Sequence, residues 1–456
     1  MKYKKSIIII LFFVSVILTP IYIIKTQNVV ALRFVKNLIP QDVKESVKKG
    51  FFFLLREEYA DLRDINERLE NKVIQLTKEK DLVNFEIFPQ TQFQKLKYKE
   101  MKLKTFKFHS SKLDNERRGL KVIPYYIENF KDKTILFSIT GQVIYFETED
   151  LINSETPKEF TIQTNLADDI TLKDALIFDN KIFVSITYRR KSCDSIDLFV
   201  ANFNLKKLEF EEFYSQNKKG ECKGWLKAGR LAKYLDNGEN SILLIAREPN
   251  GVNHFLTTEQ QKLQESHGSF DGSIIVSFNL KTKKKKIISS GHRNPQGLFV
   301  TSNNIILQTE HGPRGGDEIN KIIEGKNYGW PISSYGENYY KGLDAQENYR
   351  FKKSHSKYGL EEPIYAFVPS IGISQIIELP NSFSKKWQDN FLIASMKQGS
   401  LYRVNFNKDF TRVITWERMR VGKRIRDLSY DESTRTFFLA LEDNTGSIGI
   451  LRAENK

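Results

Sequence analysis

From about residue 100 onward, the chain alternates short apolar runs with polar turns. Runs of about five to eight residues rich in Ile, Val, Phe and Leu come in pairs, the second following the first after a loop. Six such pairs occur: KTILFSI with QVIYFE, KIFVSITY with SIDLFVANF, SILLIAR with GSIIVSF, NNIILQT with DEINKII, NFLIASM with SLYRVNF, and TFFLALE with GSIGILR. Paired short strands without long helical patterns predict an all-β protein.

The number of pairs indicates the architecture. Dividing about 350 residues among six units gives about 58 residues each, enough for a four-stranded blade with generous loops. We therefore predict a six-bladed β-propeller over residues 100–456. A β-sandwich is the alternative, but it would not explain six similar pairs in one chain of this length.

The N-terminal residues have the pattern of a membrane segment. After MKYKKS, residues 7–24 are mostly apolar, close to the ~20 residues that a helix needs to cross a bilayer. A signal peptide usually has an apolar region of ~7–15 residues and a small-residue cleavage site, and KTQNVVALRF offers no convincing one. We expect an uncleaved anchor over residues 1–25, with Lys2, Lys4 and Lys5 in the cytoplasm and the propeller exported. A cleaved signal peptide is the alternative.

A helical stalk is predicted for residues 26–85. Within residues 51–79, leucines recur every seven positions and a second seam runs between them, which fits a short coiled coil and a parallel homodimer. An amphipathic helix on the globular domain or the membrane explains the pattern equally well. The two seams are Leu55, Leu62, Leu69 and Leu76, and Phe52, Tyr59, Asn66 and Val73.

Composition and charge add little to this picture. Lys and Arg number 71 against 56 Asp and Glu, a net charge of +15, but the chain is also crowded with Ile, Asn and Phe, a bias that codon usage alone can produce. The run KTKKKK at 281–286 is placed at a turn, and no nucleic-acid module accompanies it, so we expect no nucleic-acid partner. Cys193 and Cys222 are compatible with one disulfide or with two thiols.

A glycine-rich loop, EHGPRGGDEIN at 310–320, joins two predicted strands. Gly312, Gly315 and Gly316 allow close backbone approach, and Pro313 stiffens the loop. Backbone carbonyls presented in this way suit a hard cation such as calcium. Taken alone the pattern is weak, because glycine-rich loops are usually only turns.

Several motifs together resemble the soluble quinoprotein glucose and aldose dehydrogenases, over roughly residues 225–450. The motifs are GHRNPQGL (291–298), EHGPRGGDEIN (310–320), GKNYGWP (325–331), VPSIGIS (368–374) and GKRIRDL (422–428). The resemblance implies a six-bladed propeller that carries pyrroloquinoline quinone (PQQ) and calcium and oxidises the anomeric hydroxyl of a sugar to a lactone.

The resemblance also implies roles for individual residues. Arg293 and Asn294 would approach the quinone oxygens, and the carbonyls of Gly312 and Pro313 would hold calcium. Lys397, Arg424 and Arg426 would contact the cofactor and its carboxylates. Independently of the family, a tricarboxylate needs several cations, and alternate residues on a strand point to the same face. The alternative for each basic residue is an ordinary exposed cation. Tyr328 and Trp330 are expected to pack at a blade corner, and His311 to make structural hydrogen bonds.

The pattern breaks on the substrate side. The family's general base is a histidine shortly before a Gly-Arg dipeptide, and WLKAGRL keeps Gly229 and Arg230 but has Leu226 at the histidine position. Leucine cannot accept a proton. Where the family commonly has Gly-Asp or Gly-Glu, this chain has Ala246 and Arg247.

Three hypotheses remain open. The chain is a dehydrogenase whose base comes from elsewhere, such as His254 or His267; it retains the cofactor without efficient oxidation; or it is a calcium- or glycan-binding propeller that reuses the site. Lactone or ester hydrolysis lacks a recognisable catalytic cluster beside a side-chain metal site. The substrate is expected to be a sugar or glycan, and the electron acceptor is unknown.

Overall fold

A computed structural model describes residues 85–86, 94–96, 99–105, 124–154, 156–167, 169–188, 196–215, 229–248, 254–266, 272–339, 351–442 and 447–453. The predicted anchor at 1–25, the heptads at 51–79, both cysteines, Leu226 and His267 lie outside these residues. Within the part that the structure describes, no helix is long and apolar enough to cross a membrane.

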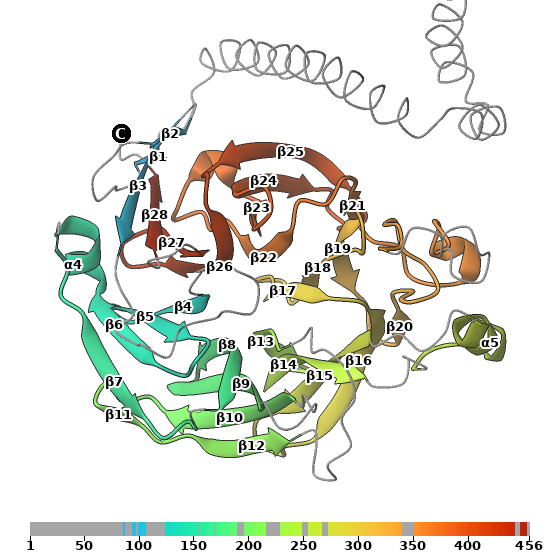
Figure 1. Cartoon of the computed structure of the whole chain (residues 1–456), viewed down its shortest axis with the longest axis horizontal. Coiled ribbons are helices and arrows are strands. Elements are labelled where there is room, and N and C mark those ends of the chain that lie inside the picture. Colours follow the sequence, from blue (N-terminus) through green and yellow to red (C-terminus); the bar gives the residue numbers. More distant parts are fainter. Residues whose placement is uncertain are drawn as a thin grey trace, which may run out of the picture. The chain divides into compact units, whose positions relative to one another are not determined.

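Six antiparallel sheets follow one another around a central axis (Figure 1). The first three blades, from the innermost strand outward, are β4 (Tyr125–Phe130), β5 (Lys133–Ser138), β6 (Val143–Glu147) and β7 (Phe160–Thr164); β8 (Ile170–Phe178), β9 (Lys181–Tyr188), β10 (Ile196–Asn202) and β12 (Glu211–Ser215); and β13 (Leu231–Asp236), β14 (Glu239–Glu248), β15 (Gly272–Asn279) and β16 (Lys285–His292).

The other three blades have the same order of strands. They are β17 (Pro295–Val300), β18 (Ile306–Glu310), β19 (Asp317–Ile322) and β21 (Tyr365–Phe367); β22 (Ile373–Glu378), β23 (Asn390–Ser395), β24 (Ser400–Phe406) and β25 (Val413–Arg420); and β26 (Arg424–Asp431), β27 (Thr436–Glu442), β28 (Ser447–Ala453) and β3 (Lys99–Thr105).

Short elements connect or extend the blades. Two-residue strands add to the first and third blades in parallel, and β1 and β2 accompany β3. These elements are β1 (Phe85–Glu86), β2 (Gln94–Leu96), β11 (Lys207–Leu208), β20 (Lys326–Asn327), the helices α4 (Thr148–Asn153) and α5 (Thr258–Ser266), and the 3-10 turns η4 (Ser356–Tyr358) and η5 (Lys385–Trp387).

The all-β, six-bladed prediction is confirmed, and the sandwich alternative is wrong. Each predicted pair of apolar runs forms the second and third strands of one blade. These middle strands pack against neighbouring blades on both faces, which explains their continuous apolar runs. All seven residues of β27 are buried, and Leu439 packs between the fifth and sixth blades with Leu392 and Leu401.

The N-terminal part of the chain completes the sixth blade. β3 pairs antiparallel with β28, with Lys104 opposite Ile448 and Lys102 opposite Ile450. Strands from the two ends of the propeller sequence therefore share one sheet, a closure that the sequence analysis did not predict.

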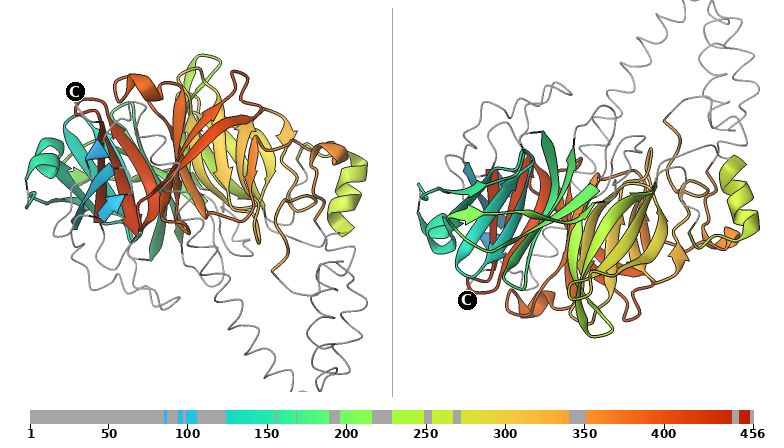
Figure 2. Two further views of the ribbon diagram at one scale, coloured as in Figure 1. Left: turned by 90° about the horizontal axis from the view of Figure 1, so that it is seen from above. Right: turned by 90° about the horizontal axis from the view of Figure 1, so that it is seen from below.

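The innermost strands β4, β8, β13, β17, β22 and β26 line the axis, and each contacts the next around the ring (Figure 1). Figure 2 shows the blades edge-on, from above and from below the view of Figure 1. Because strands alternate in direction, the starts of the first strands and the ends of the second strands meet on one face of the ring. The motifs at 291–298, 310–320, 368–374 and 422–428 all lie at this edge of their blades.

Candidate functional site

Arg293 lies between β16 and β17, and its side chain is fixed from several directions. Its Nη1 donates to the carbonyls of His311 (2.8 Å) and Gly312 (2.9 Å). The guanidinium carbon lies 5.2 Å from the centre of the Trp330 ring and 5.8 Å from that of Tyr339. The residue is buried, burial lowers the pKa of its guanidinium, and its Nε makes no hydrogen bond among the described residues. The structure thus brings Arg293 and Gly312 into direct contact.

Asn294 begins a chain of polar contacts across the same face. Its carbonyl accepts the N–H of His311 (3.0 Å), and its amide nitrogen lies 3.2 Å from Nδ1 of His311. Gln296 donates to Oδ1 of Asn294 (3.0 Å) and accepts a hydrogen bond from Nη1 of Arg426 (3.4 Å). Gln296, which the sequence analysis did not single out, therefore links the fourth blade to the sixth.

The Arg424 and Arg426 side chains converge on one carboxylate, Glu442 at the end of β27. Nε of Arg424 donates to Oε2 at 2.8 Å, and Nε of Arg426 donates to Oε1 at 2.5 Å. Burial raises the pKa of Glu442, but the two arginines outweigh it and hold that pKa below its usual range. The side chains of Arg424 and Arg426 remain 43% and 21% exposed, whereas that of Glu442 is buried.

The glycine-rich loop is held by a buried carboxylate, Asp317. A Cβ on Gly312 would lie 2.1 Å from the Gly315 carbonyl oxygen, and one on Gly316, at φ +67°, would lie 2.4 Å from the Gly336 nitrogen. The loop is therefore closed on itself and on residues 335–337, which fixes where the Gly312 carbonyl points. Asp317 accepts hydrogen bonds from the Gly312 N–H, the Ser370 hydroxyl, and the N–H groups of Gly372 and Ile373.

Lys397 follows β23 and is exposed. Its main chain lies against the VPSIGIS segment: the Met396 N–H donates to the Gly372 carbonyl at 2.7 Å, and a Cβ on Gly372 would lie 2.6 Å from the Lys397 nitrogen. The fifth blade thus places Lys397 on the same edge as the other predicted residues.

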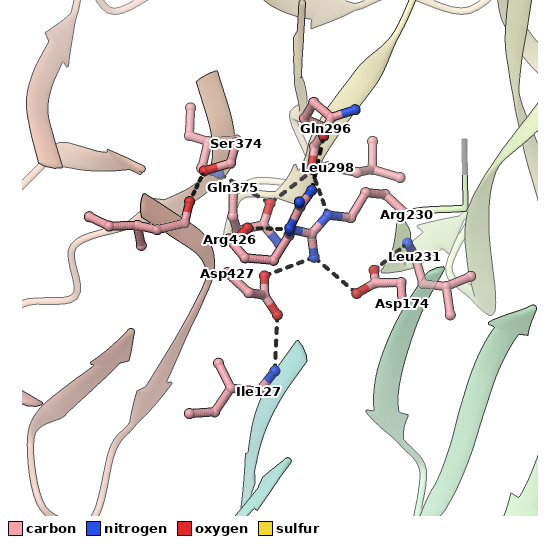
Figure 3. Close-up of polar contacts among 12 residues, drawn as sticks. Ile127, Asp174, Arg230, Leu231, Gln296, Leu298, Ser374, Gln375, Arg426 and Asp427 are labelled. Atoms are coloured by element: carbon pink, nitrogen blue, oxygen red, sulfur yellow. Dashed lines mark hydrogen bonds and ion pairs between the residues drawn. The ribbon is translucent and has the colours of Figure 1, made fainter. Parts of the chain in front are cut away.

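Arg230 is the principal residue whose role the sequence analysis missed. Its buried guanidinium donates to the Asp174 and Asp427 carboxylates, at 2.9 and 2.8 Å, and to the main-chain carbonyls of Gln296 and Arg426, at 2.6 and 3.0 Å (Figure 3). Burial raises the pKa of Asp174 to about 7; Arg230 opposes this effect and Asp427 adds to it. The family-like Gly-Arg dipeptide was the available signal.

Other residues from the sequence analysis lie near this face. The His254 carbonyl accepts from the Ser290 hydroxyl (2.6 Å) and the Asn327 amide (3.1 Å). Ala246 and Arg247 are buried near the end of β14. Tyr328 is a packing residue, buried and stacked on His292 with a ring-centre separation of 4.7 Å.

His311 has the structural hydrogen bonds expected of it, through its main chain and Nδ1. Its Nε2 is buried and makes no hydrogen bond among the described residues. Burial lowers the pKa of its imidazole, so the neutral form is favoured at pH 7.

No group of three or more His, Cys, Asp or Glu side chains within the described ranges could hold a metal ion. A calcium ion at this face would therefore depend on main-chain carbonyls such as those of Gly312 and Pro313. Within the structure, the Gly312 carbonyl accepts an N–H from Arg293, and one of its two lone pairs is left.

The glucose/sorbosone dehydrogenase family model matches residues 123–451. "Aldose sugar dehydrogenase YliI" of Escherichia coli is 35% identical over 150 residues, which is 32% of this chain and 38% of that relative. "Quinoprotein glucose dehydrogenase B" of Acinetobacter calcoaceticus is 39% identical over 107 residues, 21% of this chain and 22% of that relative. The matched segments thus span well under half of these relatives.

Solved structures support the fold. A crystal structure of a glucose dehydrogenase covers 78% of this chain and 99% of its own, with a TM-score of 0.56 and 21% identity. The soluble aldose sugar dehydrogenase from Escherichia coli, in its apo form, covers 78% of this chain and 100% of its own, with a TM-score of 0.55 and 20% identity.

Proposed function

The chain belongs to the glucose/sorbosone dehydrogenase family, and on this premise we propose that it binds PQQ and oxidises a sugar hydroxyl to a lactone. In this proposal Leu226 occupies the position of the usual catalytic histidine. The observation that carries the proposal is the convergence of Arg293, Asn294 and the Arg424–Arg426 pair on one edge of the propeller.

These residues fit a tricarboxylate quinone. Arg424 and Arg426 are partly exposed cations that both pair with Glu442, and guanidinium groups bind carboxylates with paired N–H donors. Arg293 is buried and has an Nε without a hydrogen-bond partner among the described residues. Arg424 and Arg426 would hold the carboxylates, Arg293 and Asn294 the quinone oxygens, and Lys397 would add a positive charge at the rim.

When bound, PQQ would accept the hydride that leaves the anomeric carbon of the sugar, a hydrogen nucleus together with its electron pair. The protein's part is then to orient the two molecules, supply hydrogen bonds to the quinone oxygens and remove the hydroxyl proton. Arg293 is suited to donate hydrogen bonds to the quinone oxygens, because two carbonyls and two aromatic rings keep its guanidinium from rotating.

Three histidines are candidates for removing the proton. His254 and His267 were proposed from the sequence. His311 joins them because its ring lies beside Asn294 and lowering of its pKa favours the neutral form that can act as a base. Substitution of His254 or His267 by alanine is expected to leave PQQ affinity within about threefold of the wild type, whereas His311→Ala also removes a contact of Asn294. Replacement of the histidine that removes the hydroxyl proton is expected to lower kcat for the sugar, and replacement of the other histidines is not.

Calcium is proposed at the Gly312 and Pro313 carbonyls. Because two carbonyls are far fewer than the six to eight oxygens that calcium takes, we expect the ion to bind only together with an anionic ligand that supplies the rest. Calcium alone should leave the thermal midpoint unchanged, and calcium with PQQ should raise it.

A catalytically inactive propeller that binds calcium or a glycan is the alternative, favoured by Leu226 at the base position. The two functions differ in a single experiment on the full-length chain in detergent. PQQ and calcium are added, unbound cofactor is removed, and the quinone spectrum and dye reduction are recorded with a panel of aldoses. Sugar-dependent dye reduction supports the dehydrogenase, retained quinone without turnover supports an inactive cofactor-binding protein, and no retained quinone rejects the proposal.

We also propose that residues 1–25 anchor the chain with the propeller exported, and that residues 51–79 form a dimer. An anchor would keep the reduced cofactor near a membrane or periplasmic electron acceptor. Deleting residues 1–25 is expected to release the protein from membranes and to lower sugar-dependent respiration. Unchanged respiration would contradict the proposed role of the anchor.

A further inference from the structure

Arg230 reaches the axis of the propeller because its main chain is drawn close to the second blade. A Cβ on Gly229, at φ +122°, would lie 2.3 Å from Cβ of Lys173 on β8. The Gly229 carbonyl accepts the Ser185 hydroxyl at 2.5 Å, and Arg230 pairs through its carbonyl with the Ile245 N–H at 2.9 Å. Glycine at 229 is therefore what allows the next side chain to enter the axis.

The guanidinium connects five of the six innermost strands. Nη1 lies between Asp174 on β8 and Asp427 on β26. The second oxygen of each carboxylate accepts a main-chain N–H, from Leu231 on β13 (2.8 Å) and Ile127 on β4 (3.1 Å). Together with the Gln296 carbonyl on β17, these contacts join β4, β8, β13, β17 and β26 (Figure 3).

The two remaining nitrogens act on the face where the ligand is proposed to bind. Nη2 donates to the Arg426 carbonyl, and Nε donates to the Gln296 carbonyl. Arg426 lies at a register shift of the β26–β27 ladder, between the Ile425 and Asp427 pairs, and has no residue opposite it on β27. Bulged residues lose a ladder partner, and at this position Arg230 supplies a donor to the Arg426 carbonyl.

From this geometry we infer that Arg230 is a positioning residue for the anion site: it fixes the bulge at Arg426 and the main chain of Gln296, and so sets the direction of the Arg426 side chain. The inference rests on the proposed function, since the anion it would serve is PQQ. Gln296 accepts from Arg426 and donates to Asn294, so a shift of either carbonyl would disturb both contacts.

Lysine cannot replace arginine in this role. A lysine at 230 keeps a positive charge between Asp174 and Asp427, but its single ammonium group cannot also donate to two carbonyls in the fixed fork of a guanidinium. Arg230→Lys therefore removes the positioning contacts while leaving the buried carboxylates paired.

The first test is PQQ binding by the full-length chain in detergent with calcium, followed by the quinone absorbance. Arg230→Lys is expected to raise the dissociation constant about tenfold or more, measured on the folded fraction. Two controls are matched to it: Arg403→Lys, a partly exposed arginine paired with Glu417, and Phe437→Leu, which destabilises the core without touching the site. Both should bind within about threefold of the wild type.

A second test does not require the cofactor. If Arg230 positions Arg426 against Glu442, then Arg426 is already displaced from Glu442 in the Arg230→Lys protein. Glu442→Gln should therefore lower the thermal midpoint less in Arg230→Lys than in the wild type. Arg403→Lys combined with Glu442→Gln should be additive.

The two tests separate the inference from the proposed function. Wild-type protein that fails to bind PQQ rejects the proposed function, and a non-additive cycle would still support positioning by Arg230. Additive effects of Arg230→Lys and Glu442→Gln overturn the inference. The inference is also overturned if Arg230→Lys binds PQQ with the affinity of the wild type. It is overturned as well if Phe437→Leu loses PQQ affinity in proportion to its loss of stability.

Discussion

Glu442 determines the arrangement of the two arginines at the candidate site. Its carboxylate is almost fully buried and holds two arginine side chains, so the site has a fixed cationic pair with half of its charge compensated. Two unpaired guanidiniums side by side would repel, and each would have several rotamers to choose from. The carboxylate therefore keeps the two guanidiniums together, as the proposed anion site requires.

Replacing Glu442 by Gln is expected to destabilise the protein by about 2–3 kcal/mol at pH 7, less than the ~3–5 kcal/mol of a fully buried pair because the arginines are partly exposed. The pKa of Glu442 is lowered in the folded state, so its contribution is present above the unfolded-state pKa and is lost as pH falls through the folded-state value. Urea unfolding from pH 7 to pH 3 should show the difference from the wild type shrinking below about pH 4. A difference that is constant with pH would contradict the ion-pair role.

Alanine substitutions at two glycines distinguish the free-energy cost of a left-handed backbone conformation from the cost of a steric clash at the added Cβ. Gly316 (φ +67°) and Gly325 (φ +79°) both have left-handed conformations, but only Gly316 has main chain within contact of an added Cβ. Gly325→Ala is expected to cost about 1–2 kcal/mol. Gly316→Ala should cost clearly more, because Gly336 would have to move, and denaturant midpoints measure both. Equal losses of stability in the two variants would mean that the loop at 311–317 can shift to accommodate the added Cβ.

The strand is the element on which the fold depends, and one strand is contributed from outside the repeating pattern. β3 covers β28, the outer of the three C-terminal strands in the sixth blade. An exposed edge strand presents unpaired N–H and C=O groups and invites aggregation. β3 therefore both closes the ring of blades and protects this edge.

Removal of β3 gives a direct measure of that closure. A chain that begins at residue 110 should have a thermal midpoint at least about 5 °C below one that begins at residue 85, and a greater tendency to aggregate. Differential scanning fluorimetry with light scattering reports both quantities. Identical midpoints for the two chains would show that the pairing of β3 with β28 adds no stability.

The candidate site is a property of the whole ring. Arg293 comes from the connection between the third and fourth blades, Lys397 from the fifth blade, and Arg424 and Arg426 from the sixth. Arg230 joins β4, β8, β13, β17 and β26 at the axis. A change in the packing of one blade is therefore transmitted to the others through buried polar contacts as well as through apolar contacts.

The polar contacts at the axis also predict a pH dependence of global stability. Burial raises the pKa of Asp174 to about 7, so between about pH 4 and pH 7 the folded protein holds a proton that the unfolded chain has released. The free energy of unfolding should therefore fall as pH rises through this range and then level off. Asparagine at 174 does not titrate. The difference in free energy of unfolding between Asp174→Asn and the wild type should therefore shift in favour of the variant as pH rises from 5 to 8.

Thermal unfolding of both proteins across this pH range tests the prediction. Glu432→Gln, on an exposed turn, is the control and should keep a constant difference from the wild type. A constant difference for Asp174→Asn as well would mean that Arg230 keeps Asp174 ionised throughout, and the sign of the prediction would be wrong.

The sequence alone determined the six strand pairs, the all-β class and the motifs that lie on one face of the ring, because strand periodicity and turn composition are local properties. It also indicated Arg293, Asn294, Gly312 and the Arg424–Arg426 pair. Only the tertiary structure decided that Glu442 holds the two arginines, that Gln296 bridges two blades, that β3 closes the ring, and that Arg230 joins five blades at the axis. These contacts connect residues tens to hundreds of positions apart, and no local pattern encodes which of them meet once the ring has closed.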